Sequence, residues 1–447
     1  MKTALTRTSA LALAVLFAAA GLSGCSSASG GGASPASSAD IAKAMNTPTT
    51  LTYWTWGAGT EYEVAKFEAK YPKIKVNVVN VGVGTAEYQK LRAAMSAGTG
   101  GPDAAFIEFN ELPSFRLTGS LVNLAQFDAN SVKQKFVPFA WGQVADSAGV
   151  WALPVGSGPM ASMWRTDILS NAGIATPPET WDQFAQDAKQ LKSKTGADIA
   201  SLDSGNPAQL IGLLWQAGAR PFSYDGKKTV GVDLDSATSK KVVAYWQGLI
   251  KDGLVSTGAA LTNDWYQSIN GGKIASWQTA AWGPGVLQGA AASTSGKWTV
   301  TALPQWTQGA DVGSNWGGGG DVILKNSKNP IATYEFLKFI DSDADTTLHD
   351  AVVNGQSPVT ESTLNNPEYT DAKSAFLGGQ QVNKVYASIS RAVGSDFEWP
   401  PFMDYVSSEY VSTVGAAMTS NGDMVSALSK WQQNVVAYAK DQGFTVK

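Results

Sequence analysis

Residues 51–107 have the sequence LTYWTWGAGTEYEVAKFEAKYPKIKVNVVNVGVGTAEYQKLRAAMSAGTGGPDAAFI. Short apolar runs alternate with longer segments in which apolar residues recur at helical spacing, so the stretch predicts strands that alternate with helices. These elements are expected at residues 51–54, 61–70, 74–78, 85–97 and 104–107. A strand–helix–strand–helix–strand order predicts an α/β fold, in which helices cover both faces of a mostly parallel sheet.

The chain begins with the pattern of an export signal. A basic start is followed by an apolar run at residues 11–20, which is about half the length that a bilayer span needs. Leu22–Ser23–Gly24–Cys25 resembles the lipobox of bacterial lipoproteins, in which the cysteine is acylated and becomes the mature N-terminus. Cys25 is also the only cysteine in the chain, so it has no partner for an internal disulfide. We expect a lipoprotein signal peptide at residues 1–24; the alternative is an ordinary signal peptide with an incidental cysteine.

A tether is expected after the acylated cysteine. Residues 26–39 are rich in Ser, Gly and Ala, a composition typical of flexible linkers. We therefore assign residues 25–45 to the lipidated cysteine and its tether. This places the folded body at the outer face of the bacterial cytoplasmic membrane. No later stretch has the apolar length of a membrane span, so a separate membrane protein is expected to receive whatever the chain carries.

The composition favours a neutral, hydroxylated ligand. The formal net charge of −4 argues against nucleic-acid binding. The body of about 400 residues exceeds the usual size of one hydrophobic core, so two domains are expected. The chain contains 16 tryptophans and only 16% charged residues. Indole rings stack on the flat C–H faces of sugars, so this mixture favours carbohydrate, although most of the tryptophans are expected in the core.

Several motifs in a fixed order resemble the large solute-binding proteins of ATP-binding-cassette importers, the group that includes maltose-binding protein. The resemblance covers the body from about residue 50 to the C-terminus. It is carried by Leu51–Trp56, Phe67–Val76, Gly101–Asp103, Gly119–Leu121, Trp151–Pro154, Met163–Leu169, Pro177–Phe184, Asn270–Ala275 and Gly318–Asp321.

The resemblance implies two α/β lobes that are joined by crossover segments and enclose a ligand cleft. Three breaks rich in Gly and Pro, at residues 154–158, 313–320 and 355–358, are candidate crossovers. We therefore expect an N-terminal lobe of residues 46–154 plus 318–357 and a C-terminal lobe of residues 155–317 plus 358–447. The resemblance also implies a sugar or short oligosaccharide as ligand, importer permease subunits as partners, a monomeric protein, no cofactor and no catalytic activity.

Ligands of open α/β sheets bind beyond the carboxyl ends of the strands, so candidate ligand residues are sought in the loops there. Tryptophan would stack on sugar rings, and polar groups would bind hydroxyls. The candidates are Trp56, Glu61, Glu108, Asn110, Ser157, Gly158, Trp164, Trp282, Trp316, Gly318, Asp321 and Trp399. Trp54 and Trp181 are expected in the core instead, and Trp164 fits either role.

Two alternatives remain. A secreted glycosidase would also be rich in Trp and would use two carboxylates, but no motif pairs two of them here. The other alternative is a binding protein for a non-sugar solute, such as a polyamine, metal chelate, phosphodiester or peptide. His349 is the only histidine, so neither a His/Cys zinc cluster nor the usual histidine general base has much support.

Cys25→Ser is expected to release the protein from the membrane without changing its affinity for solute, because only the acylated sulfur would hold it there. Fractionation of cells that express each form measures this. Retention of the serine variant in the membrane fraction would argue against lipidation.

Overall fold

The computed structural model describes residues 36–447. The expected signal peptide, Cys25 and the first part of the expected tether lie outside the described residues. The tether was expected to reach residue 45, but Ser38–Met45 forms helix α1. Ser37 and Asp40 form a reciprocal capping box at its start, and Met45 is buried against the core. Among the described residues, no helix has the length and apolarity to cross a membrane.

The opening strand–helix alternation is confirmed. It consists of β1 (Thr49–Trp54), α2 (Glu61–Lys70), β2 (Ile74–Val79), α3 (Thr85–Ala97) and β3 (Ala104–Glu108). β1 pairs in parallel with both β2 and β3. With the helices packed on them, these strands form the first lobe.

The other strands build the second lobe and the connections between the lobes. They are β4 (Ala145–Asp146), β5 (Gly149–Val150), β6 (Leu153–Arg165), β7 (Asp198–Asp203), β8 (Phe222–Tyr224), β9 (Thr229–Val232), β10 (Val255–Gly258), β11 (Ile274–Ala280), β12 (Trp298–Ala302), β13 (Asn315–Ile323) and β14 (Thr445–Val446). The other α-helices of at least six residues, given with one π-helical turn, are α4 (Leu112–Leu117), α5 (Pro138–Val144), α6 (Thr166–Ala172), α7 (Trp181–Thr195), α8 (Ala208–Gln216), α9 (Ala237–Lys251), α10 (Asn263–Asn270), α11 (Gly283–Ala290), α12 (Pro330–Ser342), α13 (Ala344–His349), η4 (Asp350–Asn354), α16 (Val382–Ala392), α17 (Met403–Tyr410) and α19 (Met424–Asp441).

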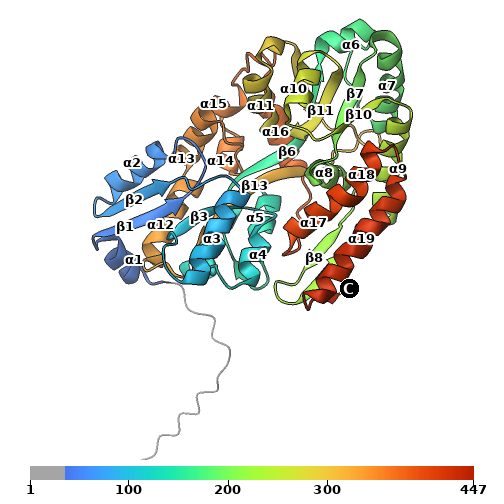
Figure 1. Ribbon diagram of the computed structural model, residues 1–447. Helices are drawn as coiled ribbons and strands as arrows, with labels where there is room; N and C mark the ends of the chain where they lie inside the picture. The colour runs from blue at the N-terminus through green and yellow to red at the C-terminus, as the bar shows by residue number, and fades with distance from the viewer. Residues whose placement is uncertain (1–35) are drawn as a thin grey trace, which may run out of the picture. The chain divides into compact units, whose positions relative to one another are not determined.

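One hydrogen-bonded sheet of the described residues runs through both lobes. Its strand order is β10-β7-β11-β6-β13-β3-β1-β2, with β12 on the second half of β6. β6 is the link: its first half pairs with β13, and its second half pairs with β11 and β12. Figure 1 shows β6 and β13 passing between the lobes. All pairs within β1–β3 and within β7, β10 and β11 are parallel, so the predicted α/β class is confirmed.

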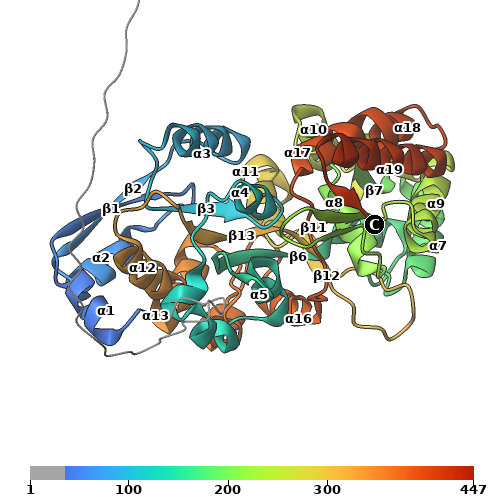
Figure 2. The ribbon, with the colours of Figure 1, turned by 90° about the horizontal axis from the view of Figure 1, so that it is seen from below.

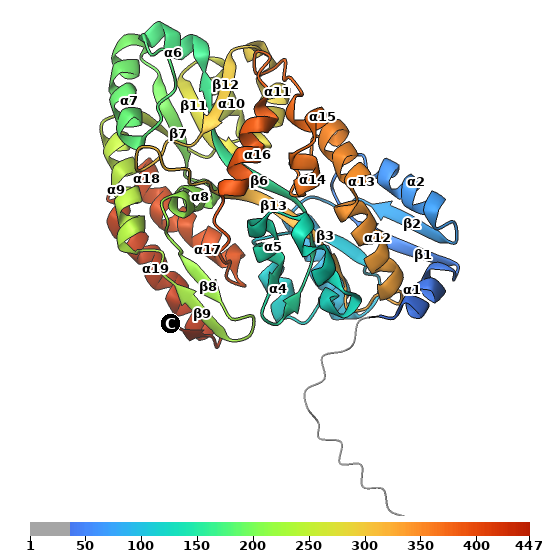
Figure 3. The same ribbon diagram turned by 180° about the vertical axis from the view of Figure 1, so that it is seen from behind.

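Helices cover both faces of the first-lobe strands. α3 lies on one face, and α1, α2 and α12 lie on the other (Figure 2). Seen from behind, α12 and α13 lie over the first lobe, while α16 packs beside β6 (Figure 3). The carboxyl ends of β1 and β3 therefore remain free to carry loops.

The crossover segments approach one another so closely that only glycine fits. A Cβ on Gly158 would lie 1.9 Å from the Trp316 carbonyl oxygen, and one on Gly320 would lie 2.6 Å from the Leu153 carbonyl oxygen. A third segment joins them, because the Ser157 N–H donates to the Ser357 carbonyl at 3.1 Å. All three breaks that were predicted as crossovers from composition thus contribute to one bundle of backbone.

Most of the tryptophans lie in the core, and they include Trp164, which was a candidate for the cleft. The fully buried ones are Trp164, Trp181, Trp215, Trp246, Trp277, Trp298 and Trp431. Trp164 was a candidate for the cleft, but it packs edge-on against Phe184 in the second lobe, and its Nε1 donates to Thr301 Oγ1 at 3.2 Å. Its place near the end of β6, with β11 on one side and β12 on the other, explains the burial.

Gly320→Ala is expected to lower the free energy of unfolding by about 1–3 kcal/mol, because the new methyl group meets the backbone of β6. Gly285→Ala is the matched control: it lies in α11, its Cβ would meet nothing within 4 Å, and alanine is the better helix former. Urea denaturation of both variants measures this. Equal stability of the two variants would contradict the tight crossover packing.

Candidate functional site

A cavity of about 330 Å³ opens between the two lobes, and we call it the cleft. It receives side chains from the start of α3, the loop after β3, the start of β13, the start of α8, and α17 with the segment before it. Its lining consists of Gly84, Thr85, Tyr88, Glu108, Phe109, Asn110, Glu111, Asn206, Pro207, Ala208, Ile211, Asn315, Trp316, Gly317, Trp399, Met403, Asp404 and Ser407. The volume suits a small solute, since ligand pockets commonly span about 300–1,000 Å³.

Glu108 is held at the end of β3 by Tyr88. The Tyr88 hydroxyl donates to Glu108 Oε2 at 2.9 Å and accepts from the Glu108 backbone N–H at 3.1 Å. Burial raises the pKa of the Glu108 carboxyl, and the hydrogen bond from Tyr88 opposes that rise. Tyr88 thus fixes the orientation of the Glu108 carboxyl group in the cleft lining.

Glu111 lies three residues further along, at the start of α4. Its Oε2 pairs with Arg92 Nη2 at 3.0 Å. Burial, with a smaller contribution from the charge of Asp404, raises the pKa of Glu111 to about 7, while Arg92 lowers it. Asp404 comes from the second lobe, so the two lobes bring like charges to the cleft.

Two indole rings supply the aromatic surface. Trp316 is half-buried at the start of β13 and meets Trp282 edge-on, with 4.9 Å between the ring centroids. Trp282 Nε1 donates to the Trp316 backbone carbonyl at 3.2 Å. Trp399 is also half-buried, and its Nε1 donates to Gln143 Oε1 at 2.8 Å. The hydrogen bonds fix Trp399 and the Trp316 backbone before any ligand arrives.

The lining combines two indoles with amides, hydroxyls and three carboxylates, and it includes no Lys, Arg or His. Carboxylates and amides accept hydrogen bonds from hydroxyl groups, and indole faces stack on apolar ring surfaces. The arrangement is suited to holding a polyhydroxylated ring. Among residues 36–447, no group of three or more His, Cys, Asp or Glu is placed to bind a metal ion.

Four of the residues predicted from the sequence line the cleft: Glu108, Asn110, Trp316 and Trp399. Trp282 does not line it and contacts Trp316 instead. Trp56 and Asp321 line a second cavity in the first lobe. There Trp56 packs edge-on against Phe106 at 4.9 Å, and Asp321 is fully buried.

The remaining candidates also lie outside the cleft lining. Glu61 is exposed at the start of α2. Ser157, Gly158 and Gly318 belong to the crossover backbone, where close packing explains the two glycines. These residues, like Trp164, are not brought together with the four that line the cleft.

Several lining residues were missed. Tyr88 fell on the apolar face of a predicted helix, although the helix start after β2 is also a strand-end position. Asn206 follows the buried strand β7, so the same rule would have selected it. Asp404 and Ser407 lie one turn apart on α17, and no local pattern distinguishes them from a solvated helix face.

The family model described as "Bacterial extracellular solute-binding protein" matches residues 53–347. Among curated proteins, the chain is 29% identical over 311 residues to a lactose-binding protein of Rhizobium radiobacter, covering 65% of this chain and 70% of that protein. It is 24% identical over 303 residues to an arabinooligosaccharide-binding protein of Halalkalibacterium halodurans, covering 65% and 67%.

Solved structures show the same fold. The binding protein from B. animalis subsp. lactis Bl-04, in complex with β-1,6-galactobiose, is 30% identical with a TM-score of 0.75, covering 90% of this chain and 100% of that one. The galacto-N-biose/lacto-N-biose I-binding protein from Bifidobacterium longum, in complex with lacto-N-biose, is 25% identical with a TM-score of 0.77, covering 89% and 98%.

Trp316→Ala is expected to weaken solute binding by at least about tenfold while changing the unliganded melting temperature little, because a half-buried stacking surface is lost. Trp282→Ala, the matched indole outside the lining, is expected to lower the melting temperature more and the affinity less. Calorimetry with lactose and β-1,6-galactobiose, beside thermal unfolding, separates the two effects. Unchanged affinity in the Trp316 variant would place the ligand elsewhere.

Proposed function

Because the chain belongs to the family of bacterial extracellular solute-binding proteins, we propose that it binds a sugar or short oligosaccharide and delivers it to the permease of an ATP-binding-cassette importer. The observation that carries the proposal is the lining of the cleft. Two indoles, Trp316 and Trp399, lie in one cavity with amide, hydroxyl and carboxylate groups and with no lining Lys or Arg. Such a surface stacks on sugar rings and binds their hydroxyls, and it offers an anionic ligand no cationic partner.

The relatives support the same ligand class. Two of the relatives described above are named for binding lactose and arabinooligosaccharide, and two of the solved structures contain β-1,6-galactobiose and lacto-N-biose. The expectation that the chain is not an enzyme is confirmed by its membership of a family of binding proteins, so the glycosidase alternative is set aside.

Ligand binding would depend on contacts from both lobes. Glu108 and Asn110 reach the cleft from the first lobe, while Asn206 and Asp404 reach it from the second. A ligand that contacts both sets stabilises a closed arrangement by the difference between its affinities for the closed and open states. Closure also removes water from the hydrogen bonds, and the closed lobes present a surface to the permease.

The anchor and the lobe boundaries complete the proposal. Acylated Cys25 and its tether would hold the body at the outer face of the cytoplasmic membrane, close to the permease. The N-terminal lobe would consist of residues 46–154 plus 318–357, and the C-terminal lobe of residues 155–317 plus 358–447. The pairing of β6 with β13 and with the segment at Ser357 supports boundaries near these positions.

Calorimetry of the purified body is expected to give saturable binding of at least one of lactose, β-1,6-galactobiose, lacto-N-biose and arabinooligosaccharides, with one site per chain. The Trp316→Ala variant serves as the control for binding in the cleft. A putrescine or phosphate titration tests the charged-solute alternative.

Tight binding of a charged solute with no binding of any sugar would overturn the ligand class while leaving the solute-binding family intact. Release of monosaccharides from the offered sugars would overturn the conclusion that the chain only binds.

A further inference from the structure

A second cavity, of about 160 Å³, touches all three crossover segments. Val155 comes from β6, Asp321 from β13 and Gln356 from the segment before Ser357. The rest of the lining comes from β1 and its following loop, β3, α2, α12 and η4. It consists of Tyr53, Thr55, Trp56, Gly57, Ala58, Thr60, Glu63, Phe106, Ile340, Asp341, Asp350 and Asn354. We call this the acidic cavity.

Four carboxyl groups line the acidic cavity, and no Lys, Arg or His lines it with them: Glu63, Asp321, Asp341 and Asp350. Three are almost completely buried, with exposed fractions of 3% for Glu63, 0% for Asp321 and 5% for Asp341. Like charges this deeply buried repel one another strongly, so a fully ionised set is unfavourable.

Two of these groups differ in their hydrogen-bond partners. The Tyr53 hydroxyl donates toward both carboxyl oxygens of Asp321, at 2.8 and 3.0 Å. Asp341 lines the same cavity, and its Oδ2 is buried without a partner among the described residues. Two buried carboxyl groups in one cavity are favourable only when one of them is neutral. Because Asp321 already accepts from Tyr53, we place the proton on Asp341.

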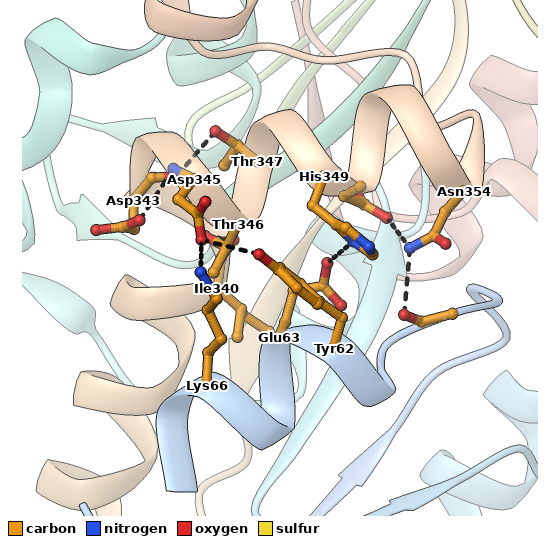
Figure 4. Close-up of polar contacts among 12 residues, drawn as sticks. Tyr62, Glu63, Lys66, Ile340, Asp343, Asp345, Thr346, Thr347, His349 and Asn354 are labelled. Atoms are coloured by element: carbon orange, nitrogen blue, oxygen red, sulfur yellow. Dashed lines mark hydrogen bonds and ion pairs between the residues drawn. The ribbon is translucent and has the colours of Figure 1, made fainter. Parts of the chain in front are cut away.

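The titratable groups around Asp321 and Asp341 come from α2, α13 and η4. On α2, Glu63 Oε1 lies 3.0 Å from His349 Nδ1, and the His349 ring stacks on Tyr62 (Figure 4). On η4, the Asp350 carboxylate accepts from Asn354 Nδ2 at 3.0 Å. Glu63 Oε2 and Asp341 Oδ2 are buried with no hydrogen-bond partner among the described residues.

Other charged groups on the neighbouring elements lie outside the lining of the acidic cavity. Lys66 and Asp345 form an ion pair beside Tyr62, seen in Figure 4. On α3, Glu87 is buried with no hydrogen-bond partner among the described residues, and burial, with a smaller contribution from the charge of Asp321, raises its pKa to about 8. No cation therefore reaches the Asp321–Asp341 pair directly among the groups that surround it.

Burial moves the titration of these groups toward neutral pH. It raises the pKa of Asp321 to about 7 and that of Asp350 to about 6, and it raises the pKa of Asp341 well above its usual range. An unfolded aspartate titrates near pH 3.9, so the folded state binds more protons above that pH. The stability that the protons confer is complete below about pH 4 and is lost as the pH rises through the folded values.

We propose that the acidic cavity is a proton-binding site that holds the crossover segments in place and makes the conformation of the cleft sensitive to pH. A proton on Asp341 lets β13 pack against α12. Its loss leaves two negative charges beside the segments that join the lobes. This deepens the proposed function, on which its consequence for sugar binding rests.

Two contacts connect the acidic cavity to the cleft. Trp56 lines the acidic cavity and meets Tyr88 edge-on, with 5.9 Å between centroids, and Tyr88 orients Glu108 in the cleft. Asp321 also follows Trp316 closely on the same strand, β13. A change at the carboxyl pair can therefore reach Glu108 and Trp316 in the cleft lining.

The test compares unfolding of the wild type and Asp341→Asn at pH 5 and pH 8, without ligand. Asparagine keeps the shape of the protonated acid but cannot ionise. Between pH 5 and pH 8, the unfolding equilibrium constant of the wild type is expected to rise relative to that of the variant, by up to about tenfold per pH unit. The variant should therefore be more stable relative to the wild type at pH 8 than at pH 5.

Asp311→Asn removes the same charge from an exposed loop and should follow the wild type at both pH values. Asp350→Asn is the second variant and should show a smaller effect of the same sign, which keeps the test decisive if Asp341→Asn does not fold. Parallel curves for all four proteins would overturn the proposal. A stabilisation of the wild type by Ca²⁺ or Mg²⁺ at pH 8 that Asp341→Asn abolishes would also overturn it, because the cavity would then bind a metal cation.

Lactose and β-1,6-galactobiose titrations at pH 6 and pH 8 test the link to the cleft. Affinity is expected to fall with pH several-fold more in the wild type than in Asp341→Asn, because Glu111 of the cleft titrates in both proteins. The same dependence on pH in both proteins would overturn the link. If no sugar binds at either pH, the proposed function fails, and the unfolding comparison still decides whether the cavity binds protons.

Discussion

β6 and β13 pass between the lobes with their backbones in direct contact, and the rest of the structure depends on this contact. Gly158 and Gly320 leave no room for a side chain, because a Cβ would fall within 1.9 and 2.6 Å of the facing carbonyl oxygens. The strands therefore pack as a ribbon whose two ends belong to different lobes. Trp316 at one end and Asp321 further along are placed by the same register. The cleft and the acidic cavity are thus two results of one crossover.

The cleft and the acidic cavity both contain buried carboxyl groups, but these groups have different neighbours. Glu108 in the cleft has a hydroxyl donor in Tyr88, and Glu111 has a cation in Arg92, so both can stay available to a ligand. Asp341 has neither a hydroxyl donor nor a cation beside it, and its buried Oδ2 has no hydrogen-bond partner among the described residues. A carboxyl in that position is stable only when it is neutral. Proton uptake and sugar capture are therefore physically distinct, although they share β13.

The order of strands and helices was predictable because it depends on local periodicity, and residues 51–107 have a clear one. The crossover glycines were also visible as composition breaks. The site was only partly predictable. Glu108 was selected by the strand-end rule and Trp316 by the Gly-rich crossover, and both line the cleft. Trp164 does not, because β6 has sheet neighbours on both sides there, which the sequence does not show. Asp404 could not be found, because its position opposite Glu111 depends on how distant segments pack.

The central claim is that the cleft holds a neutral sugar. Native mass spectrometry of the protein, purified gently from cells grown on mixed oligosaccharides, tests it most directly, because it identifies whatever solute the cleft retains. The account predicts one bound neutral oligosaccharide per chain, displaced on unfolding and missing from the Trp316→Ala variant. A retained amine, phosphate or peptide, present in both the wild type and that variant, would contradict it.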